Sequence, residues 1–249
     1  MRLRSVPGLR YNRRVSHQDE APGDVDHGLV PRTVADELRT PRAAGVAGVI
    51  FAVVIIAVEI LIHQALPTDA DQASWITDEA RRRQMTWALT LVPYAGIAFL
   101  WFIGVIRARL GNREDKLFAT TFLGSGLLFV AMLFVSAAAL GALITLQDGP
   151  HAATVDEVRL FSATAMALLT TFGIRMAAVF TLVVTNLGRR ARIVPGWLQV
   201  VGYAAALVLL LAPPRTFWAV ILFPLWVLLI SAQILVSGGR AEPADGQPT

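Results

Sequence analysis

The sequence predicts an all-α integral membrane protein, a helical bundle of about six transmembrane helices. Hydrophobic residues make up 55% of the 249 residues and charged residues only 16%, against roughly 25% charged in a typical soluble domain. The charges are also segregated. The stretch 117–146 has no ionisable residue, and 160–187 has one, Arg175. A small soluble core cannot bury several such runs, whereas a bilayer can.

The chain divides into three parts by composition. Residues 1–40 are polar and rich in Arg, Pro and Gly, so we expect a disordered basic cytoplasmic tail. Residues 41–237 form the expected six-helix transmembrane domain, and 238–249 form a polar C-terminal tail. The chain has no Cys, which excludes disulfides and thiolate metal sites.

Helix-start signals precede three of the apolar runs. Thr40 followed by Pro41 is a capping hydroxyl and then a proline at a position that needs no amide donor. Thr77 is the expected cap of an early start to the second span. Thr154 and Glu157 form a T-x-x-E capping box before the fourth. The expected spans are 41–62, 85–106, 117–146, 154–187, 196–212 and 217–236.

Span length and proline content predict deviations from straight, upright helices. The third span has 30 residues, about 45 Å of helix against a hydrocarbon core of about 30 Å, so it must tilt, kink or protrude. Pro93 and Pro224 lie inside the second and sixth spans. Each removes an amide donor, but neighbouring groups can restore the lost partner, so we expect bends rather than breaks.

The distribution of basic residues predicts the orientation. With the N-terminus inside, the cytoplasmic side receives eleven of the Lys and Arg residues near the span ends and the outer side five. The positive-inside rule then places both termini in the cytoplasm. The use of 21 Arg and one Lys, with abundant Ala and Val, is typical of GC-rich bacteria. We therefore expect a bacterial cytoplasmic membrane.

Arg175 is the most informative polar residue, because it falls near the middle of the fourth span. A charge at the bilayer centre costs on the order of 2.5–3.5 kcal/mol on insertion scales, so its guanidinium should face the bundle interior. Its expected partners are Glu59, hydroxyls of the third span such as Ser125 or Ser136, or backbone carbonyls. Two roles remain open: a binding site or gate for an anion or headgroup, and a structural ion pair or carbonyl clamp.

Other polar residues also lie within the predicted spans, in addition to Arg175. Glu59 is the one acid inside an apolar span, and His63 lies one turn further on the same face, so the pair could relay protons. Thr164, Thr171 and Arg175 follow one another at spacings of seven and four residues, so we expect them on one face of the fourth span. Hydroxyl-bearing residues at this spacing either mark close helix packing or line a polar cavity.

Three consecutive basic residues, Arg81, Arg82 and Arg83, depart from the charge rule because they lie on the outer side. They could attract an anionic substrate or lipid headgroup. Nearby acids such as Asp78 and Glu79 could instead neutralise them. Both interpretations stay open from sequence.

Several function classes lack their motifs. The sequence has no H-E-x-x-H, no phosphate-binding glycine loop and no acidic pair with metal spacing. We therefore predict no catalytic residue, no metal, no cofactor and no enzymatic activity. Orientation in the membrane explains the basic residues better than nucleic-acid binding.

The stretch WFIGVIRARLGNREDKLFATTFLGSGLLF resembles uncharacterised multi-spanning membrane proteins of actinobacterial type, a resemblance that implies origin and membership but no activity. We expect a non-enzymatic transport or small-molecule or lipid-binding bundle centred on Arg175. The alternative is a structural or accessory subunit of a membrane complex. The expected partners are membrane lipids, together with a membrane protein partner or a second copy of the chain.

Overall fold

The computed structural model describes residues 41–66, 74–110, 116–190, 194–213 and 217–238. All of them belong to one compact unit, Thr33–Thr249. The expected tail at 1–40, with the Thr40 cap, and the last eleven residues lie outside the described residues.

The described residues form helices and no strands, which confirms the predicted all-α class. Five helical stretches are long and apolar enough to cross a membrane, and α7 is a shorter sixth. Helices α5, η3 and α6 follow one another without a gap, and η3 is a π-helical segment. The elements are α2 (Pro41–Ala65), η1 (Ser74–Ile76), α3 (Glu79–Leu110), α4 (Lys116–Gln147), α5 (Val155–Ala167), η3 (Leu168–Gly173), α6 (Ile174–Arg190), α7 (Gly196–Leu211) and α8 (Phe217–Gly238).

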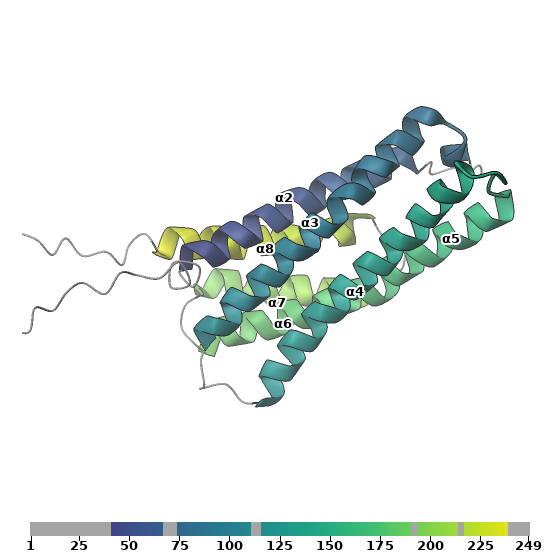
Figure 1. Ribbon diagram of the computed structural model, residues 1–249. Helices are drawn as coiled ribbons and strands as arrows, with labels where there is room; N and C mark the ends of the chain where they lie inside the picture. Colours follow the sequence, from purple (N-terminus) through teal and green to yellow (C-terminus); the bar gives the residue numbers. More distant parts are fainter. Residues whose placement is uncertain (1–40, 67–73, 111–115, 191–193, 214–216, 239–249) are drawn as a thin grey trace, which may run out of the picture. The chain divides into compact units, whose positions relative to one another are not determined.

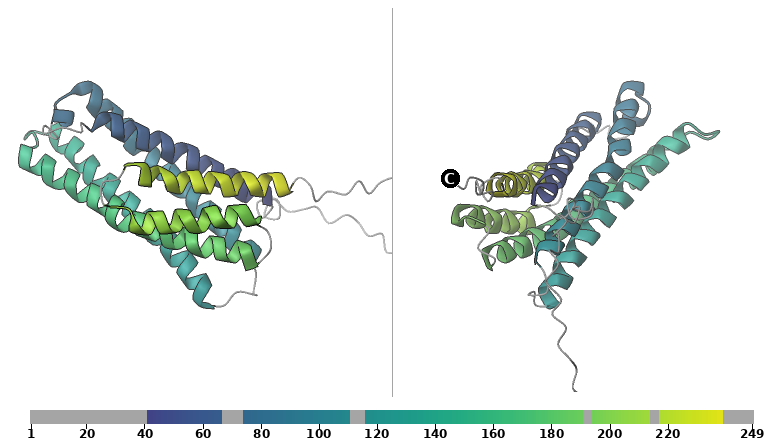
Figure 2. Two further views of the ribbon diagram at one scale, coloured as in Figure 1. Left: turned by 180° about the vertical axis from the view of Figure 1, so that it is seen from behind. Right: turned by 60° about the vertical axis from the view of Figure 1, so that its left-hand side comes forward.

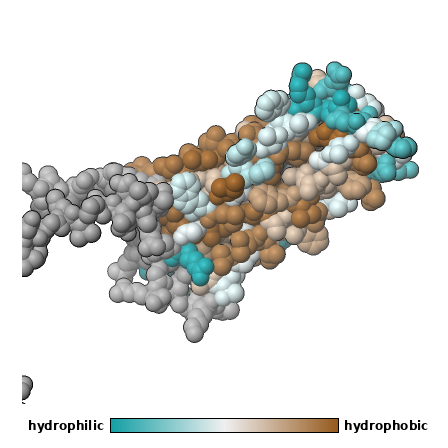
Figure 3. Space-filling view, viewed as in Figure 1, coloured by the Kyte–Doolittle hydropathy of each residue, from teal (hydrophilic) through white to brown (hydrophobic). Residues whose placement is uncertain are grey.

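Within this unit, α2 packs against α3 and α8, and α4 packs against α3, α5, η3 and α6 (Figure 1). Helix α7 lies mainly on α6. On the face seen in Figure 3, hydrophobic residues cover the middle of the helices, and hydrophilic residues gather where α3 begins and where α4 joins α5. We call this the Asp78 end of the bundle.

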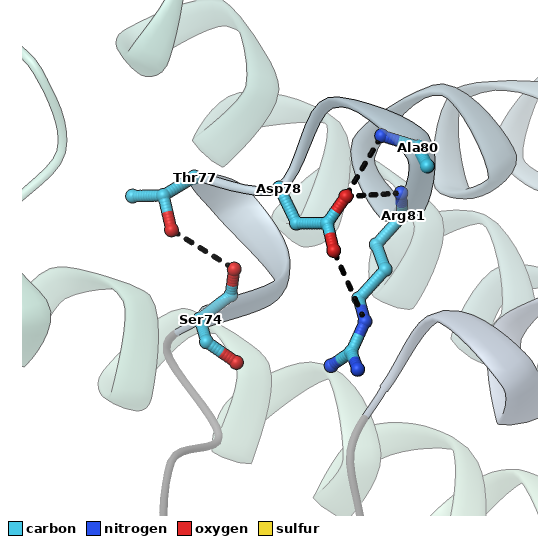
Figure 4. A network of polar contacts seen from close by, with 5 residues as sticks. All are labelled: Ser74, Thr77, Asp78, Ala80 and Arg81. Atoms are coloured by element: carbon cyan, nitrogen blue, oxygen red, sulfur yellow. Dashed lines mark hydrogen bonds and ion pairs between the residues drawn. The ribbon is translucent and has the colours of Figure 1, made fainter.

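The cap at the start of α3 differs from the sequence prediction. The carboxylate of Asp78, rather than the hydroxyl of Thr77, caps the helix: Oδ1 accepts hydrogen bonds from the amides of Ala80 at 2.9 Å and Arg81 at 3.3 Å (Figure 4). The short helix η1 explains the correction, because the Thr77 hydroxyl donates back to the carbonyl oxygen of Ser74 at 3.0 Å. Helix α3 begins at Glu79, which agrees with the early start expected from sequence and differs in the capping residue.

The predicted capping box at the start of α5 is confirmed. The Thr154 hydroxyl accepts a hydrogen bond from the Glu157 amide at 3.3 Å, and the Glu157 carboxylate accepts one from the Thr154 amide at 2.8 Å. This reciprocal pair satisfies two amides at the helix start.

An aromatic cluster fills the space between α2, α3, α4, α6 and α8. The ring of Phe99 lies at its centre and is fully buried. Its centroid is 4.6 Å from that of Phe51, 5.1 Å from that of Phe180 and 5.4 Å from that of Phe129. Rings at these separations in tilted and edge-on geometry attract one another, so the cluster holds five helices together.

Helices α3 and α8 continue through Pro93 and Pro224 without a break. This agrees with the expectation that neither proline ends its helix. The expected bends at these positions stay a prediction.

Candidate functional site

A cavity of about 420 Å³ lies between α2, α3, α4, α5 and η3. Val220, near the start of α8, lines one part of it. Most of the lining side chains are apolar. The polar ones are Glu59, His63, Ser136, Ser162 and Thr170.

The cavity lies beside the start of α8, and the helix before it, α7, is shorter than the five spanning stretches. Helix α7 has 16 residues, about 24 Å of helix, which is less than the roughly 30 Å of a bilayer's hydrocarbon core. Seen from behind, α8 begins partway along the bundle, and α2 and α5 extend beyond it on either side (Figure 2, left). Helices α2 and α5 both supply walls of the cavity.

The acidic residue of the cavity is buried without a partner. Glu59 is 6% exposed, and its carboxylate makes no hydrogen bond or ion pair with another described residue. Within the described part of the chain, no Lys or Arg lines the cavity. Burying an unpaired carboxylate is unfavourable, so this group calls for a ligand, a cation, water or a proton.

Two hydroxyl groups in the cavity wall are also unsatisfied. The Oγ atoms of Ser136 on α4 and Ser162 on α5 are buried and have no hydrogen-bond partner. Most buried polar side chains in folded proteins have at least one such partner. Three walls of one apolar cavity thus each carry a polar group that the described chain does not satisfy.

Arg175 lies beside this cavity and bonds to backbone carbonyls. In η3 the amide of Ile174 donates to the carbonyl oxygen of Leu169, five residues back. In an α-helix that amide would bond to Thr170 instead, so the π segment releases the Thr170 carbonyl. The guanidinium of Arg175 takes it, with Nη1 at 2.6 Å from that oxygen.

The second acceptor of Arg175 belongs to another helix. Its Nη2 donates to the carbonyl oxygen of Ala212, at the C-terminal end of α7, at 2.9 Å. A cation is stabilised there by the helix dipole as well as by the hydrogen bond. Of the partners expected from sequence, Arg175 therefore bonds to carbonyls, and it forms no ion pair with Glu59 among the described residues.

Thr170 connects the two features. Its buried side chain lines the cavity, while its carbonyl oxygen accepts from Arg175. Arg175 does not line the cavity itself. It fixes the π segment that forms one wall.

The structure separates the other expected site residues from the cavity. The Ser125 hydroxyl donates within its own helix, to the carbonyl of Thr121 at 2.7 Å. Thr164 is exposed and donates to the carbonyl of Leu160 at 2.8 Å. Thr171 is half-buried and does not line the cavity. The common face expected for Thr164 and Arg175 assumes a regular period, and the π segment between them changes that period.

The basic cluster at the start of α3 is neutralised in part by acids. Arg81 pairs with Asp78, with its Nε 3.5 Å from Oδ2 (Figure 4). Arg82 lies 3.9 Å from the carboxylate of Asp148, beyond the end of α4, and also donates to the carbonyl of Ile76 at 3.3 Å. Arg83 is exposed. For Arg81 and Arg82, these contacts favour neutralisation by nearby acids over a free anion site.

Sequence reasoning missed Ser162 and Thr170 as cavity residues. The signal that could have found Ser162 is its spacing of four and seven residues from Met166 and Leu169. This spacing places the three residues on one helical face, and all three line the cavity. Thr170 has no such signal, because its place depends on the π segment. No group of three or more His, Asp or Glu side chains within the described residues is placed to hold a metal ion.

No protein-family model, curated protein or solved structure matches this chain. The geometry of the cavity is therefore the basis for assigning a function.

Proposed function

We propose that this chain is a non-enzymatic membrane protein that binds an amphipathic small molecule or lipid in the cavity between α2 and α5. The observation that supports it most is the unpartnered Glu59 carboxylate in a cavity of about 420 Å³ with mainly apolar walls. Ligand sites in proteins commonly have this volume and a few polar groups on apolar walls. Such binding is also the first step of transport.

The location of the cavity supports a ligand that dissolves in the membrane. Its walls belong to helical stretches that are long and apolar enough to cross a membrane, and most of its lining side chains are apolar. A molecule with an apolar tail could reach such a cavity from the surrounding lipid. Arg175 contributes by holding the π segment against α7.

The proposed orientation places both termini in the cytoplasm of a bacterial cell, with the protein in the cytoplasmic membrane. Its support is the eleven-to-five distribution of basic residues. The Asp78 end, with its acidic and basic side chains, then faces outward. Membrane lipids are the proposed partners, and nucleic acid is not.

Cysteine labelling tests the proposal, because the chain has no native Cys. Ala137 lines the cavity, whereas its neighbour Ala138 is exposed on another face of α4 at nearly the same depth. In reconstituted membranes, a small water-soluble thiol reagent should modify Ala137→Cys faster than Ala138→Cys. Added amphiphile should slow the reaction at Ala137→Cys alone.

A third variant controls for dry packing. Ser231 is fully buried on α8 and touches α2, since a Cβ built at Gly48 would lie 2.0 Å from its Oγ. Ser231→Cys should stay unmodified. If Ala137→Cys reacts as slowly as this control, the interior is dry. That result contradicts the binding function and favours the structural or accessory subunit.

A further inference from the structure

We infer that the cavity selects a ligand with a cationic ammonium head and an apolar tail. This inference rests on the proposed binding function and names its ligand class. The three unsatisfied polar groups and the charge of the cavity carry the argument.

The formal charge of the cavity comes from one acid. Among the described residues that line it, Glu59 is the one Asp or Glu, no Lys or Arg is present, and His63 is the one other titratable side chain. Two arginines outside the cavity have other partners, since Arg175 bonds to two carbonyls and Arg82 pairs with Asp148. A cationic ligand would give the buried carboxylate the counter-charge that the described chain does not provide.

The hydrogen-bonding groups match an ammonium better than other heads. A primary ammonium has three donors and no acceptor. The Glu59 carboxylate is a strong acceptor, and the unsatisfied hydroxyl oxygens of Ser136 and Ser162 can accept as well. A carboxylate or phosphate head would instead bring a like charge to Glu59. A neutral alcohol would leave that charge uncompensated.

The apolar walls suit the tail. Leu89 and Val92 on α3, Leu133 and Leu140 on α4, and Met166 and Leu169 on the α5–η3 side line the cavity. Burying a methylene group against such walls contributes about 0.8 kcal/mol relative to water. The same head and tail occur in a free alkylamine and in an ethanolamine-headed lipid.

Equilibrium binding to the full chain in phosphatidylcholine nanodiscs tests the inference, with empty nanodiscs subtracted. The probes are octylamine, 1-octanol and octanoate, which share an eight-carbon tail and differ in the head. We expect octylamine to bind most tightly. Glu59→Gln should weaken octylamine binding at least tenfold, about 1.4 kcal/mol, and remove its preference over octanol.

Two further variants control for folding and charge. Glu79→Gln makes the same chemical change at an exposed residue at the start of α3 and should leave all three affinities unchanged. Glu59→Asp keeps the carboxylate and should keep the preference for octylamine over octanol, even if every affinity falls. Loss of that preference in Glu59→Asp as well as in Glu59→Gln would contradict a role for charge.

The outcomes separate this inference from the proposed function. If octanol or octanoate binds as tightly as octylamine, or if octylamine binding survives Glu59→Gln, the ammonium inference is wrong while the binding function stands. If no probe binds and Ala137→Cys is unreactive, both are wrong. Once amine binding is established, nanodiscs that contain phosphatidylethanolamine identify the source: reduced octylamine binding indicates the lipid headgroup, and unchanged binding indicates a free amine.

Discussion

The guanidinium of Arg175 joins the carbonyl oxygen of Thr170, five residues before it, to that of Ala212, 37 residues after it. Both carbonyls lie where the α-helical hydrogen-bond pattern is interrupted. The π segment releases the first, and the second lies at the C-terminal end of α7. A cation within an apolar span is costly unless it is satisfied in this way. The same contact holds the end of α7 beside η3, and the next helix, α8, borders the cavity through Val220.

Replacing Arg175 should destabilise the bundle. Hydrogen bonds from a charged donor contribute roughly 1.5–3 kcal/mol each, and loss of a cation from the apolar span offsets part of this. We expect Arg175→Met to lower the free energy of unfolding by about 2–4 kcal/mol. Unfolding in mixed detergent measures it. Arg175→Lys should recover part of this loss. If Arg175→Lys is as unstable as Arg175→Met, the result contradicts a stabilising interaction with the carbonyls.

Arg175 and Glu59 should behave independently. No ion pair joins them among the described residues, and residues without a shared contact have nearly additive effects on stability. A double-mutant cycle with Arg175→Met and Glu59→Gln should give a coupling below about 0.5 kcal/mol. A larger coupling would mean that the two side chains pair in the membrane.

Deleting Phe172 should turn the π segment into regular α-helix. The residue is 57% exposed, and removing one residue from a π segment restores the α period without changing the faces on either side. The amide of Arg175 would then bond to the Thr170 carbonyl, and the guanidinium would lose that acceptor. We expect unchanged helical circular dichroism but lower stability and slower labelling of Ala137→Cys. Unchanged labelling would show that the π segment does not shape the cavity.

A methyl group at Gly48 should destabilise the contact between α2 and α8. A Cβ there would lie 2.0 Å from Oγ of Ser231 and 2.9 Å from the ring of Phe102. Overpacking costs about 1–3 kcal/mol, and the better helix propensity of alanine offsets about 0.5–1 kcal/mol. Detergent unfolding should show Gly48→Ala as destabilised. Gly104→Ala is the control, because nothing lies within 4 Å of its Cβ, and it should be neutral or stabilising.

Labelling from the two sides of the membrane tests the proposed topology. A Cys at Gly149, between α4 and α5, should react with an impermeant reagent from outside, and one at Arg190, at the end of α6, should react from the cytoplasm. The reason is the positive-inside distribution of Lys and Arg. Access to Gly149→Cys from the cytoplasm alone, or to Arg190→Cys from outside alone, would reverse the orientation.

Local signals in the sequence determined the helices. Long uncharged runs predict spans because so many consecutive apolar side chains must be buried in lipid or in a protein core. Helix caps such as Thr154 with Glu157 depend only on residues that are close together in sequence. The need of Arg175 for polar partners was equally predictable, since it follows from its position in an apolar run. Two expected site residues, Glu59 and Ser136, do line the cavity.

Tertiary structure decided which groups meet. The choice of carbonyls over Glu59 as partners of Arg175 depends on the π segment and on where α7 ends beside it, and both are set by packing between segments far apart in sequence. The π segment also changes the helical period, which separates Thr164 from the face expected for it and brings Thr170 to the cavity. Hydropathy reports how long a helix is and which residues it contains. It does not report which helices pack together, and that packing decides which side chains line the cavity.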